Sequence, residues 1–345
     1  MSESRTALVI TSISGPNAVL RSFAEGCLGH GIQFILIGDK PSPADFHLNG
    51  CDFWSLERQR SMPFELARIL PERHYGRKNL GYLEAISHGA EVILESDDDN
   101  FPRAEFWHAR KAQLQAEALV NAGWVNVYRY FSGERIWPRG YPLEHLQKQL
   151  PSPADAQLLH CPIQQGLADE NPDVDAIYRL AGVLPLNFEE RDPLALGKGS
   201  WCPFNSQNTT WTAEAFPLLY LPSHCSFRMT DIWRSYVAVR ICWENGWNVL
   251  FHNATVWQER NEHDLMKDFA DELIGYQNNR AICEQLEALS LRPGAEHIME
   301  NMMVCYERFI AMGLVGKAEI PLLQAWVNDM AALHTESMRS GRQAT

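Results

Sequence analysis

Three short apolar runs in the first hundred residues each end in polar residues, and this pattern most restricts the fold that the chain can adopt. The runs lie at 7–14 (ALVITSIS), 33–43 (QFILIGDKPSP) and 91–95 (EVILE). Uninterrupted apolar runs are typical of parallel strands that are covered on both faces. A segment with helical spacing at 19–23 separates the first two runs. The sequence therefore predicts an α/β fold with a mostly parallel central sheet flanked by helices.

The alternation of strands and helices is expected to continue to about residue 130. Residues 79–89 (NLGYLEAISHG) have the pattern of a helix with Asn79 as N-cap and Gly89 just past its end. A helix rich in Ala, Gln and Glu is then expected before a strand at 124–131 (WVNVYRYF). Each strand of such a series ends at the sheet edge where α/β proteins bind ligands.

The rest of the chain divides into two parts. Residues 131–230 are rich in Pro and Gly and are too long for a simple linker, so we expect binding loops built on the scaffold. After about residue 261 the apolar spacing becomes helical. We therefore predict a catalytic domain over 1–260 and a helical C-terminal appendage over 261–345.

Composition excludes some classes of protein. A formal net charge of −13 and a pI near 5.4 argue against nucleic-acid binding, which depends on clustered Lys and Arg. A small anionic ligand in a local basic pocket stays open. The sequence has neither a signal-like start nor an uncharged apolar run of about eighteen residues. We expect a cytoplasmic protein without a transmembrane segment, and a homo-oligomer is left open.

The acidic triplet Asp97–Asp99 follows the third apolar run directly. In an extended chain Asp97 and Asp99 would face one ion, whereas Asp98 would point elsewhere. A hard divalent cation such as Mn²⁺ or Mg²⁺ would relieve the repulsion between these carboxylates and bridge to a diphosphate. The alternative is a solvated turn whose acids cap a following helix.

Other polar residues stand near the expected strand ends. Asp39 closes the second apolar run, where ligand-binding groups of α/β sheets are found. Arg77 and Lys78 could neutralise phosphate charge, or could be an ordinary basic pair before the helix.

Two motifs in the loop-rich region carry charged residues. Arg139 stands between Pro138 and Gly140, where a restricted backbone can present its guanidinium at a defined place. Asp173 and Asp175 are spaced i, i+2, and a turn with an N-cap before a short helix explains them equally well.

Later motifs add amides, one helix start and two histidines. The segment 203–211 (PFNSQNTTW) is dense in amides and hydroxyls, which suit sugar hydroxyls or a base edge. Asp231 is either a cap of a helix or a carboxylate directed into a cleft, with Arg234 one turn later. His252 and His263 are candidate metal ligands or acceptor contacts, although a lone His is more often structural.

Several motifs, taken in order, resemble the STELLO glycosyltransferase-like proteins and, more distantly, the reversibly glycosylated polypeptides, the UDP-arabinopyranose mutase family. They are RKNLGYLEAISHGAEVILESDDDN, WPRGYPL, NPDVDAIYRL, PFNSQNTTW and DIWRSY. The likeness extends over about 75–255, with a looser likeness before it and none expected in the last 85 residues.

The resemblance implies a GT-A type fold that binds a nucleotide-diphospho-sugar, with Asp97, Asp98 and Asp99 matching the Asp-rich DXD motif that holds Mn²⁺ or Mg²⁺. Arg139 matches an R-G-Y-P segment whose Arg is associated with self-glycosylation and mutase activity. We expect Asp97, Asp99 and His252 to ligate the metal, and Asp231, Arg139 and Asp175 to be catalytic, with Asp231 preferred as the base. The expected donor-binding residues are Asp39, Arg77, Lys78, Asn79, Asp98, Asn205, Gln207, Asn208 and Arg234.

The first functional hypothesis is thus a metal-dependent glycosyltransferase that moves a sugar from a UDP-sugar or a related donor to a hydroxyl acceptor. A nucleotide-sugar mutase would need no acceptor and would use Arg139. A scaffold on a degenerate transferase fold is a third hypothesis, which the intact triplet disfavours. A phosphohydrolase would be expected to carry its acidic nucleophile near the first strand.

Overall fold

The structure is a computed structural model that describes residues 5–259 and 264–343. In this part of the chain the strands form an 11-stranded sheet in the order β3-β2-β1-β4-β12-β9-β13-β10-β6-β8, with β5 paired to β13 and a separate β11-β7 pair. The strands are β1 (Thr6–Thr11), β2 (Gln33–Ile37), β3 (Asp52–Trp54), β4 (Val92–Ser96), β5 (Asn100–Pro102), β6 (Gln113–Leu119), β7 (Gly123–Trp124), β8 (Ala154–His160), β9 (Ile163–Asp169), β10 (Leu194–Leu196), β11 (Ser200–Trp201), β12 (Asn208–Thr212) and β13 (Val249–Gln258).

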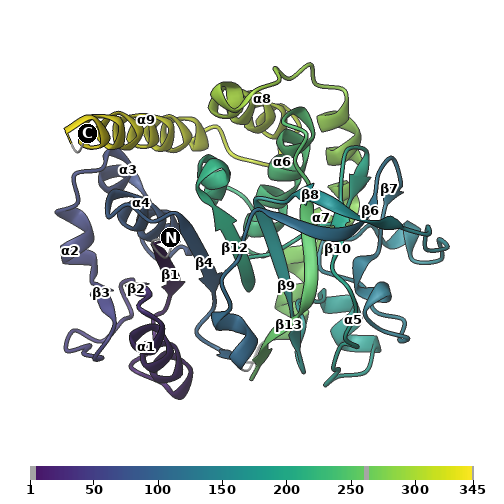
Figure 1. Cartoon of the computed structure of the whole chain (residues 1–345), viewed down its shortest axis with the longest axis horizontal. Helices are drawn as coiled ribbons and strands as arrows, with labels where there is room; N and C mark the ends of the chain where they lie inside the picture. Colours follow the sequence, from purple (N-terminus) through teal and green to yellow (C-terminus); the bar gives the residue numbers. More distant parts are fainter. Residues whose placement is uncertain (1–4, 260–263, 344–345) are drawn as a thin grey trace.

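Helices lie around this sheet (Figure 1). The α-helices are α1 (Ala18–His30), α2 (Leu56–Arg60), α3 (Glu65–Ile69), α4 (Lys78–Ser87), α5 (Ala176–Ala181), α6 (Thr230–Glu244), α7 (Leu265–Glu287), α8 (Ile298–Ala311) and α9 (Glu319–Gln343). The 3-10 turns are η1 (Tyr75–Arg77), η2 (Ala104–Trp107), η3 (Val127–Tyr130), η4 (Leu143–His145), η5 (Ala213–Leu219), η6 (Phe227–Met229) and η7 (Ala295–His297).

The N-terminal strands are covered on both faces, as their apolar runs predicted. Alternate residues of β1 point to opposite sides: Val9 packs in one core cluster with Leu80 of α4, whereas Leu8 packs in another with Phe23 of α1. Strands β3, β2, β1 and β4 pair in parallel. Their carboxyl ends therefore meet at one edge of the sheet.

The sheet as a whole is mixed, so the prediction of a mostly parallel sheet was wrong beyond β4. Strand β12 is antiparallel to both β4 and β9, and β10 is antiparallel to β13. The expected helix rich in Ala, Gln and Glu is strand β6, in which Ala116 and Ala118 are buried and Gln113 and Gln115 are exposed. Pairing with β8 and β10 outweighs the helical propensity of these residues.

Two local expectations were also wrong. The strand expected at 124–131 is the short β7 followed by the 3-10 turn η3. Asn79 is not an N-cap, because the turn η1 runs directly into α4, which begins at Lys78. Its side chain instead exchanges two hydrogen bonds with the main chain of Leu221, at 2.9 and 2.8 Å. Gly89 does lie just past the helix, with φ of 76°.

The helical character predicted after residue 261 is confirmed by α7, α8 and α9. Ile282, Cys305 and Trp326 from these helices belong to the same core cluster as Trp211 of β12. Helix α9 also packs against α3 and α4 near the start of the chain (Figure 1). The division into two domains at 260 stays a prediction.

Candidate active site

A cavity of about 530 Å³ opens at the carboxyl ends of β1, β2 and β4. Ser12, Asp39 and the triplet Asp97–Asp99 line its wall on the sheet side. Arg139 and Asp231 line it from elements much later in the chain. The strand-end positions inferred from the apolar runs therefore meet in one hollow.

The triplet forms a turn between β4 and β5 rather than an extended segment. Asp97 Oδ1 accepts hydrogen bonds from Tyr75 Oη at 2.9 Å and from Lys78 Nζ at 3.5 Å. The Asp98 carboxylate accepts a hydrogen bond from Ser12, at the end of β1. Burial raises the pKa of Asp97 to about 7, although the Lys78 charge opposes this.

Asp99, the third carboxylate, accepts a hydrogen bond at Oδ2 from Gln258 Nε2, at 3.0 Å. Asp99 and Gln258 both line the cavity. The three acids thus separate in direction, and Asp98 turns toward β1. The turn replaces the extended geometry on which the i, i+2 expectation was based.

The basic pair expected to meet phosphate is instead bound to protein. Lys78 is buried and donates to Tyr75 Oη at 2.9 Å and to the Ser96 carbonyl at 2.8 Å. The Arg77 guanidinium donates to Gln59 Oε1 at 2.7 Å and to the main-chain carbonyls of residues 70 and 71. These contacts hold the wall of the cavity in shape.

Asp39 follows the carboxyl end of β2 and lines the cavity. Its Oδ2 accepts a hydrogen bond from the main chain of His74 at 2.9 Å. Exposed Phe227 lies edge-on to His74 and Tyr75, at 6.2 and 6.1 Å between ring centroids. This part of the cavity therefore combines a carboxylate with aromatic surface.

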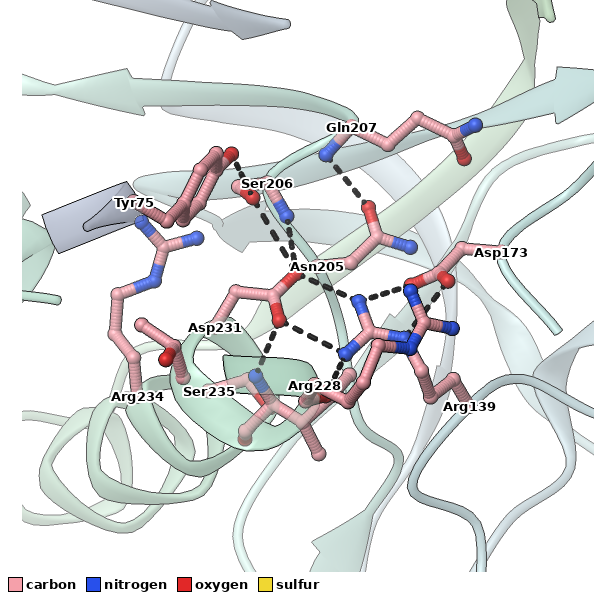
Figure 2. A network of polar contacts seen from close by, with 12 residues as sticks. Tyr75, Arg139, Asp173, Asn205, Ser206, Gln207, Arg228, Asp231, Arg234 and Ser235 are labelled. Carbon is pink, nitrogen blue, oxygen red and sulfur yellow. Dashed lines mark hydrogen bonds and ion pairs between the residues drawn. The ribbon is translucent and has the colours of Figure 1, made fainter. Parts of the chain in front are cut away.

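Arg139 is held between two carboxylates (Figure 2). Its Nε and Nη2 donate to Asp173 at 2.8 Å each, and its Nη1 and Nη2 donate to Asp231 at 3.0 and 2.9 Å. Nη1 also donates to the Arg228 carbonyl. Burial alone would lower the pKa of Arg139, but the two carboxylates outweigh it and raise that pKa well above its ordinary value.

Asp231 lies in the first turn of α6 and is directed into the cavity, not onto the helix end as its cap. It accepts hydrogen bonds from Arg139 and from the N–H and hydroxyl of Ser206, at 3.2 and 3.3 Å (Figure 2). Burial would raise the pKa of Asp231, but the Arg139 charge prevails and lowers it to about 2. Such a carboxylate stays ionised and is weakly basic.

A hydrogen-bond chain joins the two acidic groups. Ser206 Oγ lies 3.3 Å from Asp231 Oδ2 and 2.6 Å from Tyr75 Oη, so its single hydrogen can serve either contact (Figure 2). Tyr75 Oη in turn lies 2.9 Å from Asp97 Oδ1. Sequence reasoning missed Tyr75, Ser206 and Gln258 as site residues, since neither their type nor their spacing marks them.

Several expected site residues do not line this cavity. Asp175 caps α5 through Tyr178 N at 2.8 Å and accepts from Trp137 Nε1 at 2.6 Å, so the structural alternative for it holds. Arg234 is buried in an ion pair with Glu95 at 2.7 Å.

The amide residues of the segment 203–211 also divide between the cavity and the protein interior. Gln207 lines the cavity, whereas Asn205 and Asn208 bond to the neighbouring main chain and side chains of the sheet. The buried strand β12 that follows turns these amides inward.

His252 is separated from the triplet. It lines a second cavity, of about 870 Å³, and its Nδ1 lies 3.0 Å from the Asn253 carbonyl. Burial and the nearby Arg110 charge lower the pKa of His252 to about 3. The structure therefore does not bring His252 to Asp97 and Asp99, and His263 lies outside the described residues.

None of the helices within residues 5–259 and 264–343 is both long enough and apolar enough to span a bilayer. The fold and the site thus define an α/β protein with a cavity at the carboxyl edge of its sheet, lined by several carboxylates.

Comparison with known proteins finds a similarity to the STELLO glycosyltransferases. The model of the STELLO glycosyltransferases matches residues 228–339. Probable glycosyltransferase STELLO2 of Arabidopsis thaliana is 29% identical over 321 residues, covering 87% of this chain and 41% of the relative. Probable glycosyltransferase STELLO1 of the same plant is 27% identical over 357 residues, covering 96% of this chain and 45% of the relative. These matches support a STELLO-like family assignment, as the motifs predicted.

The extent of the likeness differs from the expectation. The family model matches α6 to α9, so the last 85 residues, expected to contribute nothing, carry much of it. The chain spans less than half the length of the two plant relatives. Among solved structures, the crystal structure of a mycobacterial protein is similar with a TM-score of 0.40 and 11% identity, over 80% of this chain and 74% of that chain.

Proposed function

We propose that this protein is a glycosyltransferase of the GT-A type, which binds a nucleotide-diphospho-sugar donor in the cavity and transfers the sugar to a hydroxyl acceptor. The observation that carries the proposal is the Asp97–Asp99 turn at the end of β4. It opens into the cavity, in a chain that is similar to the STELLO glycosyltransferases.

The chemistry of Asp97 and Asp99 fits Mn²⁺ or Mg²⁺. Both offer carboxylate oxygens to the cavity, and the described residues place their hydrogen bonds to Asp97 on Oδ1. Within residues 5–259 and 264–343 no three or more His, Cys, Asp or Glu form a ready metal site. Donor phosphates and water would therefore complete the coordination, which is usual for Mg²⁺. A bound cation would supply stabilisation of negative charge on the departing diphosphate.

The remaining contacts orient this site. Lys78 and Tyr75 fix Asp97, and Gln258 fixes Asp99, so the two carboxylates keep their directions before a ligand arrives. Asp39 and the aromatic surface of Phe227 offer a polar and a stacking contact for the nucleoside.

Mutase chemistry would require Arg139 to act on the donor sugar. Its N–H groups are all bound to Asp173, Asp231 and the Arg228 carbonyl, so the geometry gives no support for that second function.

For the proposed glycosyltransferase, Asp99→Ala should remove about 2.7–4 kcal/mol of transition-state stabilisation, and with it most of the turnover.

The test is thermal unfolding with a panel of nucleoside diphosphates and nucleotide sugars, with and without Mn²⁺. A ligand at a hundredfold its Kd stabilises the folded state by about 2.7 kcal/mol, which shifts the midpoint measurably. We expect a manganese-dependent shift in the wild type and its loss in Asp97→Ala/Asp99→Ala.

The matched control is Asp155→Ala/Asp192→Ala, which removes two exposed carboxylates that line neither cavity. This control should keep the wild-type shift. No shift with any nucleotide, or an equal shift in all three proteins, would contradict the proposal.

A further inference from the structure

Arg139 has no donor left for a ligand. A guanidinium carries five N–H groups. Nε and Nη2 bind Asp173, Nη1 and Nη2 bind Asp231, and the other Nη1 hydrogen meets the Arg228 carbonyl. A phosphate could reach this guanidinium only by displacing a buried carboxylate. One cation between two carboxylates leaves a net formal charge of −1, which also disfavours an anion.

The two carboxylates of this cluster differ in their remaining capacity. Asp231 accepts from Arg139, from Ser206 N and Oγ, and from the main chain of Ile232. Asp173, among the described residues, accepts side-chain hydrogen bonds from Arg139 alone. A carboxylate can accept about four hydrogen bonds. Asp173, whose side chain lines the cavity, therefore keeps acceptor positions for a ligand.

Gln258 supplies a second hydrogen-bond acceptor in the same cavity. Gln258 lines the same cavity with 9% of its surface exposed, and its Oε1 is buried and accepts no hydrogen bond from the described residues. Its Nε2 is already bound to Asp99. The Asn171 side chain donates to the Gln258 carbonyl at 3.1 Å, which ties Gln258 to the loop that carries Asp173. Two acceptors in one cavity favour a ligand that donates hydrogen bonds.

Two further arginines line this end, and both already bind protein. Arg228 donates to Glu272 at 2.9 and 2.7 Å, and Arg179 donates to the Pro172 carbonyl at 2.8 Å. Hydroxyl groups donate hydrogen bonds, whereas ionised phosphate oxygens only accept them. The open acceptor positions of Asp173 and Gln258 thus match the hydroxyl groups of a neutral polyhydroxyl ligand.

We propose that the Arg139–Asp173 end of the cavity binds the hydroxyl groups of a neutral carbohydrate, with Asp173 as the carboxylate that touches it. Arg139 is a positioning residue that holds the Asp173 carboxylate in place, and Asp231 in turn holds Arg139. The identification of that carbohydrate as the sugar of the donor or of the acceptor rests on the proposed function. The hydroxyl-binding role itself does not depend on the nucleotide.

The experiment compares wild type, Asp173→Asn and the charge-matched control Asp155→Asn, whose residue is exposed on β8. Isothermal titration calorimetry measures the affinity of each protein for UDP and for UDP-glucose in the presence of Mn²⁺. Saturation-transfer NMR measures the binding of free hexoses and pentoses in the absence of nucleotide. Asp173→Asn should bind UDP like the wild type but bind UDP-glucose or the free sugars about 10- to 100-fold more weakly, as expected for the loss of a hydrogen bond to a charged acceptor.

The outcomes separate the two proposals. If no nucleotide binds while a free sugar binds to the wild type and not to Asp173→Asn, the glycosyltransferase proposal fails and the hydroxyl site stands. If UDP and UDP-glucose weaken equally, if inorganic diphosphate displaces a bound sugar, or if no sugar contributes to binding, the hydroxyl site is refuted. Asp173→Ser serves as a second variant should Asp173→Asn fail to fold.

Discussion

The substitution Arg139→Met would leave the half-buried Asp173 and the buried Asp231 without the cation that pairs them. Methionine keeps much of the volume of the arginine stem, so the loss is chiefly one of charge and hydrogen bonds. Breaking a buried ion pair by removing one partner costs about 3–5 kcal/mol. The pKa of Asp231 is about 2 in the folded chain against an ordinary 3.8, which corresponds to about 2 kcal/mol of stability at neutral pH.

The sign of the pH dependence gives the sharper test. In the wild type the stability from Asp231 is complete above pH 3.8 and is lost as the pH falls toward 2. Without Arg139, burial raises the pKa of Asp231 above its unfolded value, so the folded variant gains stability on protonation. The difference between wild type and variant should therefore be largest at pH 7 and should shrink toward pH 4.5.

Urea unfolding followed by tryptophan fluorescence at pH 7 and pH 4.5 measures both effects. The control is Arg280→Met, which breaks an exposed pair with Glu144 and should change the free energy of unfolding by less than about 1 kcal/mol. The reasoning is refuted if Arg139→Met costs no more than the control, or if its cost is the same at both pH values.

Three other predictions concern stability, each measured by urea unfolding. Asp329→Ala should cost about 1 kcal/mol, because Asp329 accepts hydrogen bonds at 2.8 and 2.9 Å from the first two N–H groups of α3; an unchanged midpoint would contradict this. Arg234→Met should cost about 3–5 kcal/mol by leaving the buried Glu95 with only the more distant Lys78 cation, at 3.9 Å, and adding Glu95→Gln should recover part of that loss. The pKa of His252 is lowered to about 3, so wild type should lose stability as the pH falls from 6.5 toward 3, and His252→Gln should lose less over the same range.

Part of the site could be predicted from the sequence because it follows the sheet. Asp39 and the triplet stand directly after apolar runs, and parallel strands bring such positions together at one edge. The directions of the three acids, with Asp98 toward Ser12 and its neighbours toward Tyr75 and Gln258, come from a turn and not from the extended segment that the i, i+2 argument assumed. Local pattern therefore predicted the place of the triplet but not the directions of its side chains.

The rest of the site depends on contacts between distant segments. Arg139 lies 34 residues from Asp173 and 92 from Asp231, and no local pattern pairs them. The sequence favoured Asp175 over Asp173 as a site residue, and the start of α5 decides between them. Because α5 begins at Ala176, Asp175 is its N-cap, and Asp173 lies in the preceding loop, where it binds Arg139. Sheet pairing, not propensity, decided β6 in the same way.

Helix α9 packs against α3 and α4 near the start of the chain, and this affects the order in which parts of the chain complete their folding during synthesis. Asp329 caps α3, and Glu319 accepts hydrogen bonds from the main chain of Ser223 and His224. The N-terminal strands emerge from the ribosome first and tend to fold first. Their helix α3 nevertheless acquires its cap only after some 260 further residues have been made. A segment made early is therefore completed by one that is made much later.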